Sequence, residues 1–299
     1  MATAVMTPAG HADAPATAHG DRPEAGTKRV LYGTALVLSL IVFVVPLLWA
    51  LMRSVQPNAV ITAPPDGATF FDLTFGNFQS LTSFGTIGRA VVNSVVVSLS
   101  AAALTALVAT AAGYGFARFR IRGATLAFAL ILVTMMVPFQ AIITPLFMEL
   151  NAMRLTNNLL GLVLFYTTVN LPFGVFVMRT AFAAVPRDLE EAANVDGAGT
   201  LRTVVSVLRP LVVPGMATVA LYAFLASWTE FLGALTFLTD QDLYTLPVAL
   251  LNLQQGAYGA IDFGFLAAGS VVAMIPCVVL FVALQRYYVA GLASGAIKG

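Results

Sequence analysis

The sequence predicts an all-α, polytopic membrane protein with six transmembrane helices. Of its 299 residues, 59% are hydrophobic and 10% are charged, whereas an average soluble domain has about 25% charged residues. The mean hydropathy is +0.88. A helix needs about 20 apolar residues to cross a bilayer, and six stretches meet that length. They run approximately over residues 30–52, 90–117, 124–148, 159–178, 211–238 and 263–284.

Prolines lie inside these predicted helices. Proline removes a backbone hydrogen bond and is rare inside soluble helices, but bundled transmembrane helices accommodate it as a kink. The prolines are Pro46, Pro138, Pro145, Pro172, Pro214 and Pro276. We therefore expect bent helices around a path. The small residues of the segment 113–119 are interpreted as close helix-packing positions rather than a cofactor site.

Residues 1–28 are predicted to form a disordered cytoplasmic tail, because they lack apolar periodicity. Both histidines, His11 and His19, lie in this tail. The predicted folded body, 29–299, therefore offers no Ser-His or Cys-His nucleophile pair and no histidine-rich metal site. With a net charge of +1 and only two lysines, a nucleic-acid partner is not expected. The sequence also has no Gly-Lys dipeptide, so a P-loop within it is excluded.

Arginine and lysine residues lie mainly on one side of the predicted topology. Twelve fall on that side, and three, Arg53, Arg89 and Arg154, fall on the other. Cytoplasmic loops carry the excess of basic residues, so both termini are predicted to be cytoplasmic. The loop 239–262 has three aspartates and no basic residue, and we expect it to be external.

The cytoplasmic link between the fourth and fifth predicted spans is unusually acidic. Four of the chain's 14 acids lie within nine positions: Asp188, Glu190, Glu191 and Asp196. Acids complement the positive end of a helix dipole, proline suits a first helical position, and glycine can end a helix in the left-handed conformation. The order of Pro186, the acids and Gly197 therefore predicts a short helix over residues 186–196.

One face of this predicted helix carries Leu189, Ala192 and Ala193. The two alanines would leave a shallow surface that another protein can approach closely. The alternative is an amphipathic helix lying on the membrane surface. Anionic headgroups attract lysine and arginine rather than carboxylates, so the acids favour a protein partner.

The run EAANVDGAGTLRTVVSVLRPLVVP, which begins at Glu191, resembles the EAA loop of permease subunits of bacterial ABC importers. The pattern of that loop is EAA-x3-G-x9-I-x-LP. Here Glu191, Ala192, Ala193, Gly197 and Pro210 match, Val207 stands for the isoleucine, and Arg209 replaces the leucine.

Further segments are similar to carbohydrate-type permeases that resemble the second permease of the maltose importer. They are NS at 93–94, MVPFQAIITPLFMEL at 136–150, LPFGVFVMRTAF at 171–182 and QRYYVAGLASGAIKG at 285–299. The segment WTEF at 228–231 departs from the Trp-Asn-x-Phe that is common in the family.

The resemblance implies a permease subunit in the bacterial inner membrane that forms half of a translocation path for a sugar or oligosaccharide. Its implied partners are a second homologous permease, two ATPase subunits that bind ATP and Mg, and an extracytoplasmic solute-binding protein. This chain would hold no cofactor and catalyse no reaction itself. The ATPase-coupling residues, inserted into a groove of the ATPase, would be Glu190, Glu191, Ala192, Ala193, Asp196 and Gly197.

Three polar or aromatic residues in the predicted spans are candidates for the substrate path. Glu230 is an acid inside a predicted span, and such a group is a functional-site hypothesis by default. Its alternative is a satisfied carboxyl near the outer interface. Trp228 has an interface anchor as its alternative, and Asn93 an interhelical hydrogen bond.

Two other function classes are weighed against the permease. An ion-coupled secondary transporter would normally have ionisable residues midway through several spans and internal symmetry, and the sequence offers only Glu230 and no convincing repeat. A membrane enzyme has little catalytic chemistry available, because the predicted spans lack acid pairs and histidines.

Overall fold

The computed structural model describes residues 24–64, 67, 69–83, 85–256 and 261–296. Every regular element in these ranges is a helix. The chain divides into two units, residues 1–49 and 50–299. In the described ranges, five helices are long and apolar enough to cross a membrane, and one bent helix pair would make a sixth. The predicted all-α, multi-pass class is thus confirmed.

The first unit holds most of helix α1 (Glu24–Ser54). Its apolar part, Lys28–Ser54, has a mean hydropathy of 2.7, and its large apolar side chains such as Phe43 are exposed, which suits a lipid environment. Pro46 lies inside α1 without ending it. The predicted disordered tail lies outside the described residues as far as residue 23, and the helix begins at Glu24 rather than at Val30.

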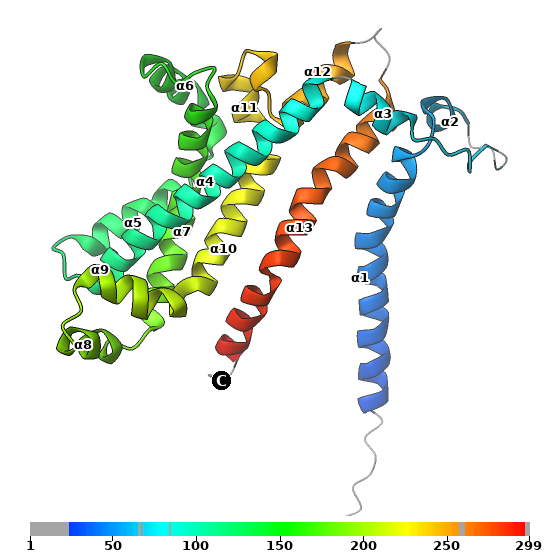
Figure 1. Ribbon diagram of the computed structural model, residues 1–299. Helices are drawn as coiled ribbons and strands as arrows, with labels where there is room; N and C mark the ends of the chain where they lie inside the picture. Colours follow the sequence, from blue (N-terminus) through cyan, green and yellow to red (C-terminus); the bar gives the residue numbers. More distant parts are fainter. Residues whose placement is uncertain (1–23, 65–66, 68, 84, 257–260, 297–299) are drawn as a thin grey trace, which may run out of the picture. The chain divides into compact units, whose positions relative to one another are not determined.

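Three long helices form the centre of the second unit: α4 (Gly85–Arg118), α7 (Leu159–Ala184) and α10 (Arg209–Thr229) (Figure 1). α4 contacts both α7 and α10. A Cβ atom on Gly113 would lie 2.5 Å from Cβ of Met178, and one on Gly174 would lie 2.8 Å from Cβ of Ala109. Glycine at these two positions allows the helices to approach closely.

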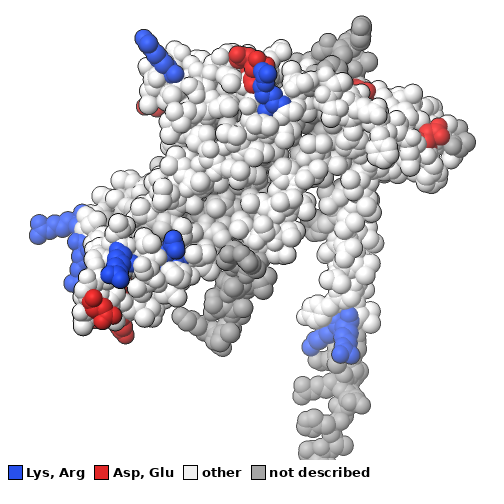
Figure 2. Space-filling view, viewed as in Figure 1, with Lys and Arg blue, Asp and Glu red and all other residues white. Residues whose placement is uncertain are grey.

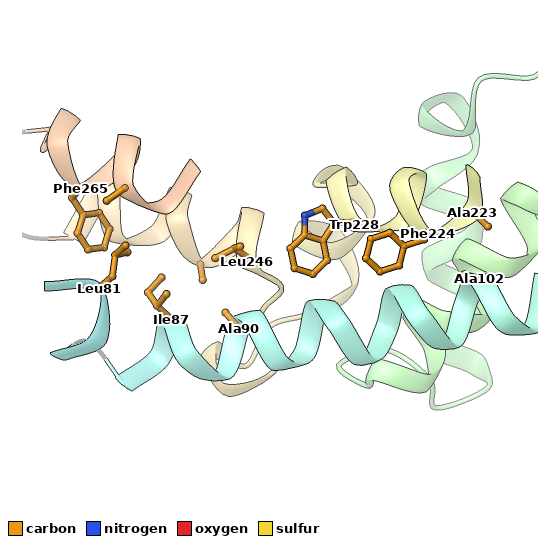
Figure 3. Close-up of a cluster of buried hydrophobic side chains, with 11 residues drawn as sticks. Leu81, Ile87, Ala90, Ala102, Ala223, Phe224, Trp228, Leu246 and Phe265 are labelled. Atoms are coloured by element: carbon orange, nitrogen blue, oxygen red, sulfur yellow. The ribbon is translucent and has the colours of Figure 1, made fainter. Parts of the chain in front are cut away.

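A cluster of buried apolar side chains joins α4 and α10 to α12 (Leu246–Gly256) and α13 (Phe263–Ala296) (Figure 3). It includes Ile87, Ala90, Phe224, Trp228, Leu246, Ala249, Phe265 and Ala268. Trp228 and Phe224 stack with a ring-centroid distance of 5.7 Å and an interplanar angle of 11°. α13 is therefore attached to the central helices through side chains from both α10 and α12.

The third predicted span, 124–148, is not one helix. Its first part is α5 (Ala124–Thr134), and its second part is η1 (Phe139–Ile142) followed by α6 (Ile143–Ala152). The two parts meet at an angle of 90°. Pro138 has an extended backbone and no N–H to donate, so a helix cannot pass through it without losing a hydrogen bond.

The fifth predicted span, 211–238, also ends earlier than expected. α10 stops at Thr229, and a separate helix, α11 (Leu232–Phe237), follows. α11 lies with other short helices at the end of the bundle opposite α8 (Asp188–Val195) (Figure 1). The other short helices at that end are α2 (Asn58–Thr62), α3 (Gly76–Ser83), α6, η3 (Gln241–Leu243) and α12.

Charged side chains of the second unit gather mainly towards its two ends (Figure 2). Arg118 and Glu190 lie at the α8 end and form an ion pair. Arg89 and Asp242 lie at the opposite end and form another, with more than half of each side chain exposed. Few charged groups lie between these ends on the face in view, as expected for a segment surrounded by lipid.

Candidate functional site

The predicted cytoplasmic helix is present as α8, which runs from Asp188 to Val195 and places three acids in its first turn. Gly197 has a φ of +74°, the left-handed conformation that glycine adopts readily. The N–H of Ala198 donates to the carbonyl of Ala193 at 2.9 Å, and the N–H of Gly197 donates to the carbonyl of Asn194 at 3.0 Å. These paired bonds form a Schellman motif, so the helix end predicted at Gly197 is confirmed.

The face predicted from Leu189, Ala192 and Ala193 is divided in the structure. Ala193 is 8% exposed and packs inward, whereas Leu189 is 40% exposed and Ala192 is also exposed. Val195, which was not part of the prediction, is 87% exposed. The outward surface of α8 therefore includes Ala192 and Val195, with the exposed acid Glu191 beside them. The division arises because helical spacing groups residues but does not say which of them meets the bundle.

Glu190 differs from the other acids of α8 because it is turned towards the bundle. Its carboxylate forms an ion pair with the guanidinium of Arg118, the last residue of α4, at 2.5 Å. The two side chains are 17% and 6% exposed, respectively. The same guanidinium donates a 2.8 Å hydrogen bond to the carbonyl of Val185. Glu190 thus pairs with a residue of its own chain, whereas Glu191 remains exposed. The sequence spacing alone did not show that these two acids have different surroundings.

A π-helical segment follows α8 in the chain. After α9 (Thr200–Arg202), residues Thr203–Leu208 form η2, and α10 then begins. The N–H of Arg209 donates to the carbonyl of Val204, five residues earlier. Pro210 has no N–H for the carbonyl four residues before it, so a wider helical turn before this proline is physically reasonable. The sequence analysis did not predict this irregular helix, although Pro210 is a local signal for one.

Asn93 and the neighbouring Ser94 attach α4 to the chain segment that leads into α12. The side-chain amide of Asn93 donates to the carbonyls of Asp242 and Tyr244 at 2.9 and 3.1 Å. The N–H of Leu246 donates to the hydroxyl of Ser94 at 2.7 Å. The contacts of Asn93 support its alternative role, an interhelical hydrogen bond, because Asp242 belongs to η3.

Trp228 is 3% exposed, so it is a buried packing residue in this chain rather than an exposed interface anchor. Its indole N–H donates to the carbonyl of Ala273 on α13 at 3.0 Å. This hydrogen bond satisfies the polar end of an otherwise apolar ring. The suggested role of Trp228 and Asn93 in a substrate path stays a prediction.

Glu230 was expected inside a span, but it lies at the junction between α10 and α11. Its carboxylate accepts hydrogen bonds from the N–H groups of Gly233 and Ala234 at 2.8–3.2 Å, at the first turn of α11. It also accepts one from the hydroxyl of Tyr166 at 2.8 Å. A carboxylate is stabilised at a helix N-terminus by such donors, so helix capping accounts for this acid. Its role in a substrate path stays a prediction.

The family assignment comes from sequence comparisons. The family model described as "Binding-protein-dependent transport system inner membrane component" matches residues 106–294. The chain is 33% identical over 287 residues to the diacetylchitobiose uptake system permease protein NgcG of Streptomyces coelicolor, which covers 95% of this chain and 92% of that protein. It is 31% identical over 276 residues to the trehalose transport system permease protein SugB of Mycobacterium tuberculosis, and the match covers 92% of this chain and 100% of that protein.

The fold is also similar to a solved bacterial ABC transporter involved in the import of the acidic polysaccharide alginate. The TM-score is 0.74 at 21% identity, with 92% of this chain and 100% of that chain covered. At this level of identity the similarity supports the fold alone. The sequence relatives and the family match carry the assignment further. The chain belongs to the family of inner-membrane components of binding-protein-dependent transport systems, and it is a multi-pass permease subunit of an ABC importer.

Proposed function

We propose that this permease forms half of a translocation path for a sugar or oligosaccharide and that α8 is its docking element for an ATPase subunit. The complete transporter would contain a second homologous permease, two ATPase subunits and an extracytoplasmic solute-binding protein. ATP and Mg would be bound by the ATPase subunits. Both termini of this chain would lie in the cytoplasm.

The observation that carries the docking proposal is the outward surface of α8. This surface exposes the small side chain of Ala192, the apolar side chain of Val195, which is 87% exposed, and the carboxylate of Glu191. An exposed apolar group on a helix rimmed by acids suits a protein groove with a basic edge better than it suits anionic lipid. The helix projects at one end of the bundle (Figure 1), where a subunit outside the membrane can reach it.

Basic residues support the cytoplasmic placement of that end. The turn between α4 and α5 contains Arg120 and Arg122, and Arg187 and Arg202 flank α8. The opposite end contains the segment 239–243 with its two aspartates. An excess of basic residues marks the cytoplasmic side of a membrane protein.

The sugar class is proposed from the relatives. NgcG is named as a diacetylchitobiose permease and SugB as a trehalose permease, and a third relative, from Thermococcus litoralis, is named as a trehalose/maltose permease at 29% identity over 274 residues. Oligosaccharides of this kind are therefore the first substrates to test. An ion-coupled mechanism has no support from Glu230, whose carboxylate caps α11 and accepts a hydrogen bond from Tyr166.

The docking proposal is tested by replacing Glu191 with lysine and purifying the transporter through an affinity tag on this chain. The variant is expected to retain about tenfold less ATPase subunit than the unmodified chain, because a charge reversal at a docked carboxylate introduces like-charge repulsion. Asp72→Lys is the matched control, since it makes the same charge change at an exposed acid outside the α8 region. Equal ATPase retention in both variants would mean that α8 is not the docking element.

A further inference from the structure

The guanidinium of Arg118 joins three parts of the chain. It ends α4, it forms an ion pair with Glu190 of α8, and it donates to the carbonyl of Val185 between α7 and α8. Its side chain is 6% exposed. A buried guanidinium is expensive to desolvate unless its partners are held in place. The contact therefore fixes the position of α8 relative to the end of α4.

Apart from its packing against η2, α8 has few contacts with which to hold that position. It has eight residues, and an isolated helix of that length is marginal in water. Ala193 is its one buried residue among those described. At its start, Arg187 donates to the carbonyl of Ala117 at 3.5 Å, which is at the outer limit for a hydrogen bond. The Arg118–Glu190 pair is therefore the main direct contact through which a displacement of α8 would act on α4.

α4 extends from this pair to the opposite end of the bundle. It is a single helix of 34 residues, which corresponds to a length of about 50 Å. Near its other end, Asn93 and Ser94 hydrogen-bond to the backbone of Asp242, Tyr244 and Leu246. One rigid element thus connects α8 to the segment 242–246 through polar contacts at each end.

We propose that Arg118 and Glu190 are positioning residues through which α4 transmits movement of the ATPase-bound α8 to the segment 242–246. This inference rests on the proposed docking of α8. Glu191 would contact the ATPase, whereas Glu190 would connect the docked helix to the bundle. Two adjacent glutamates then have separate tasks, and their substitutions should have different effects.

The experiment measures hydrogen–deuterium exchange of the backbone amides of residues 242–246 in the assembled transporter, with and without ATP plus vanadate. This probe needs no knowledge of the sugar. In the unmodified protein, nucleotide trapping is expected to change the exchange of these amides. Glu190→Gln and Arg118→Met should reduce that change by about tenfold, the scale of a typical coupling between sites, while the ATPase subunits stay bound and hydrolyse ATP.

Two further variants separate coupling from simple support. Arg118→Lys keeps a positive charge but cannot make both contacts of the guanidinium fork, so it should restore part of the nucleotide response. Arg120→Gln removes an exposed arginine two positions away and should leave the response unchanged. A response lost equally in both of these variants would overturn the proposal.

The outcomes also distinguish this inference from the docking proposal. If Glu191→Lys releases the ATPase but Glu190→Gln keeps the full nucleotide response, docking stands and transmission through Arg118 is wrong. The inference is equally wrong if Glu190→Gln itself releases the ATPase, because the pair would then serve docking alone. It is also wrong if the unmodified protein shows no nucleotide response at 242–246. If Glu191→Lys retains the ATPase, the docking proposal is the one that fails.

Discussion

The hydroxyl of Tyr166 donates a 2.8 Å hydrogen bond to the carboxylate of Glu230, and this bond joins α7 to the junction between α10 and α11. Tyr166 is 2% exposed. Because the same carboxylate caps the first turn of α11, the bond helps to orient that cap. The pair therefore links the end of the fifth span to the fourth.

Replacing Tyr166 with phenylalanine should destabilise the protein without altering the packing of the ring. A hydrogen bond to a charged group contributes about 1.5–3 kcal/mol to the free energy of unfolding, so the purified transporter should show a lower melting temperature in detergent. Tyr222→Phe is the control, because the Tyr222 side chain is 42% exposed and its ring packs on Phe173. The same melting-temperature decrease in both variants would speak against a special role for the Tyr166–Glu230 bond.

A second prediction concerns Gly113, where α4 packs closely against α7. A Cβ atom there would lie 2.5 Å from Cβ of Met178 and 2.8 Å from the backbone of Arg179. Gly113→Ala should therefore reduce the free energy of unfolding by about 1–3 kcal/mol through overpacking. Gly115→Ala lies two residues along the same helix and would meet nothing within 4 Å. Thermal unfolding of the two variants should differ clearly, and a neutral Gly113→Ala would contradict the packing.

Gly197 provides a third prediction, on backbone conformation. Valine at a φ of +74° would be strained by about 1–3 kcal/mol, so Gly197→Val should disturb the end of α8. The expected result is normal membrane insertion with less ATPase subunit retained on purification. Gly199→Val is the control, because Gly199 has a φ of −69° and open space around its Cβ position. If the Gly199 variant loses as much ATPase as the Gly197 variant, the left-handed turn is not what matters.

Alanine substitutions of Ser94 and Ser98, which lie one turn apart on α4, should have different effects on the stability of the protein. Ser94→Ala removes the acceptor of the buried N–H of Leu246, and a buried donor without a partner costs about 1–3 kcal/mol. The hydroxyl of Ser98 is buried and lacks a hydrogen-bond partner among the described residues, so Ser98→Ala should be neutral or slightly stabilising. Melting temperatures measure both changes. A destabilising Ser98→Ala together with a neutral Ser94→Ala would reverse the expected order.

The sequence predicted the apolar class and the C-terminal end of α8 well, because both depend on local chemistry. The start was less accurate, since α8 begins at Asp188 and not at Pro186. Hydropathy identifies a long apolar segment whatever it packs against. Gly197 could be predicted as the helix end because the left-handed backbone conformation there strongly favours glycine. Both of these signals lie within a few residues of the feature that they predict.

The errors arose where one local pattern allows two structures. An apolar segment interrupted by Pro138 can form a kinked span or two helices at an angle, and the 90° break between α5 and η1–α6 was the outcome. Glu230 was placed inside a span because apolar residues surround it in sequence, but α10 ends just before it. Ala192 and Ala193 are adjacent, and the local sequence does not say which of them is buried once α8 packs against η2.

Site-specific photocrosslinking from Val195 tests the central claim most directly. In a Cys277→Ala background, which removes the sole native cysteine, Val195→Cys would carry a benzophenone maleimide, with Thr239→Cys on the segment that follows α11 as the control. The account predicts that the Val195 probe crosslinks to the ATPase subunit and the Thr239 probe does not. A Val195 probe that reacts with lipid alone, in a transporter that still holds its ATPase, would contradict it.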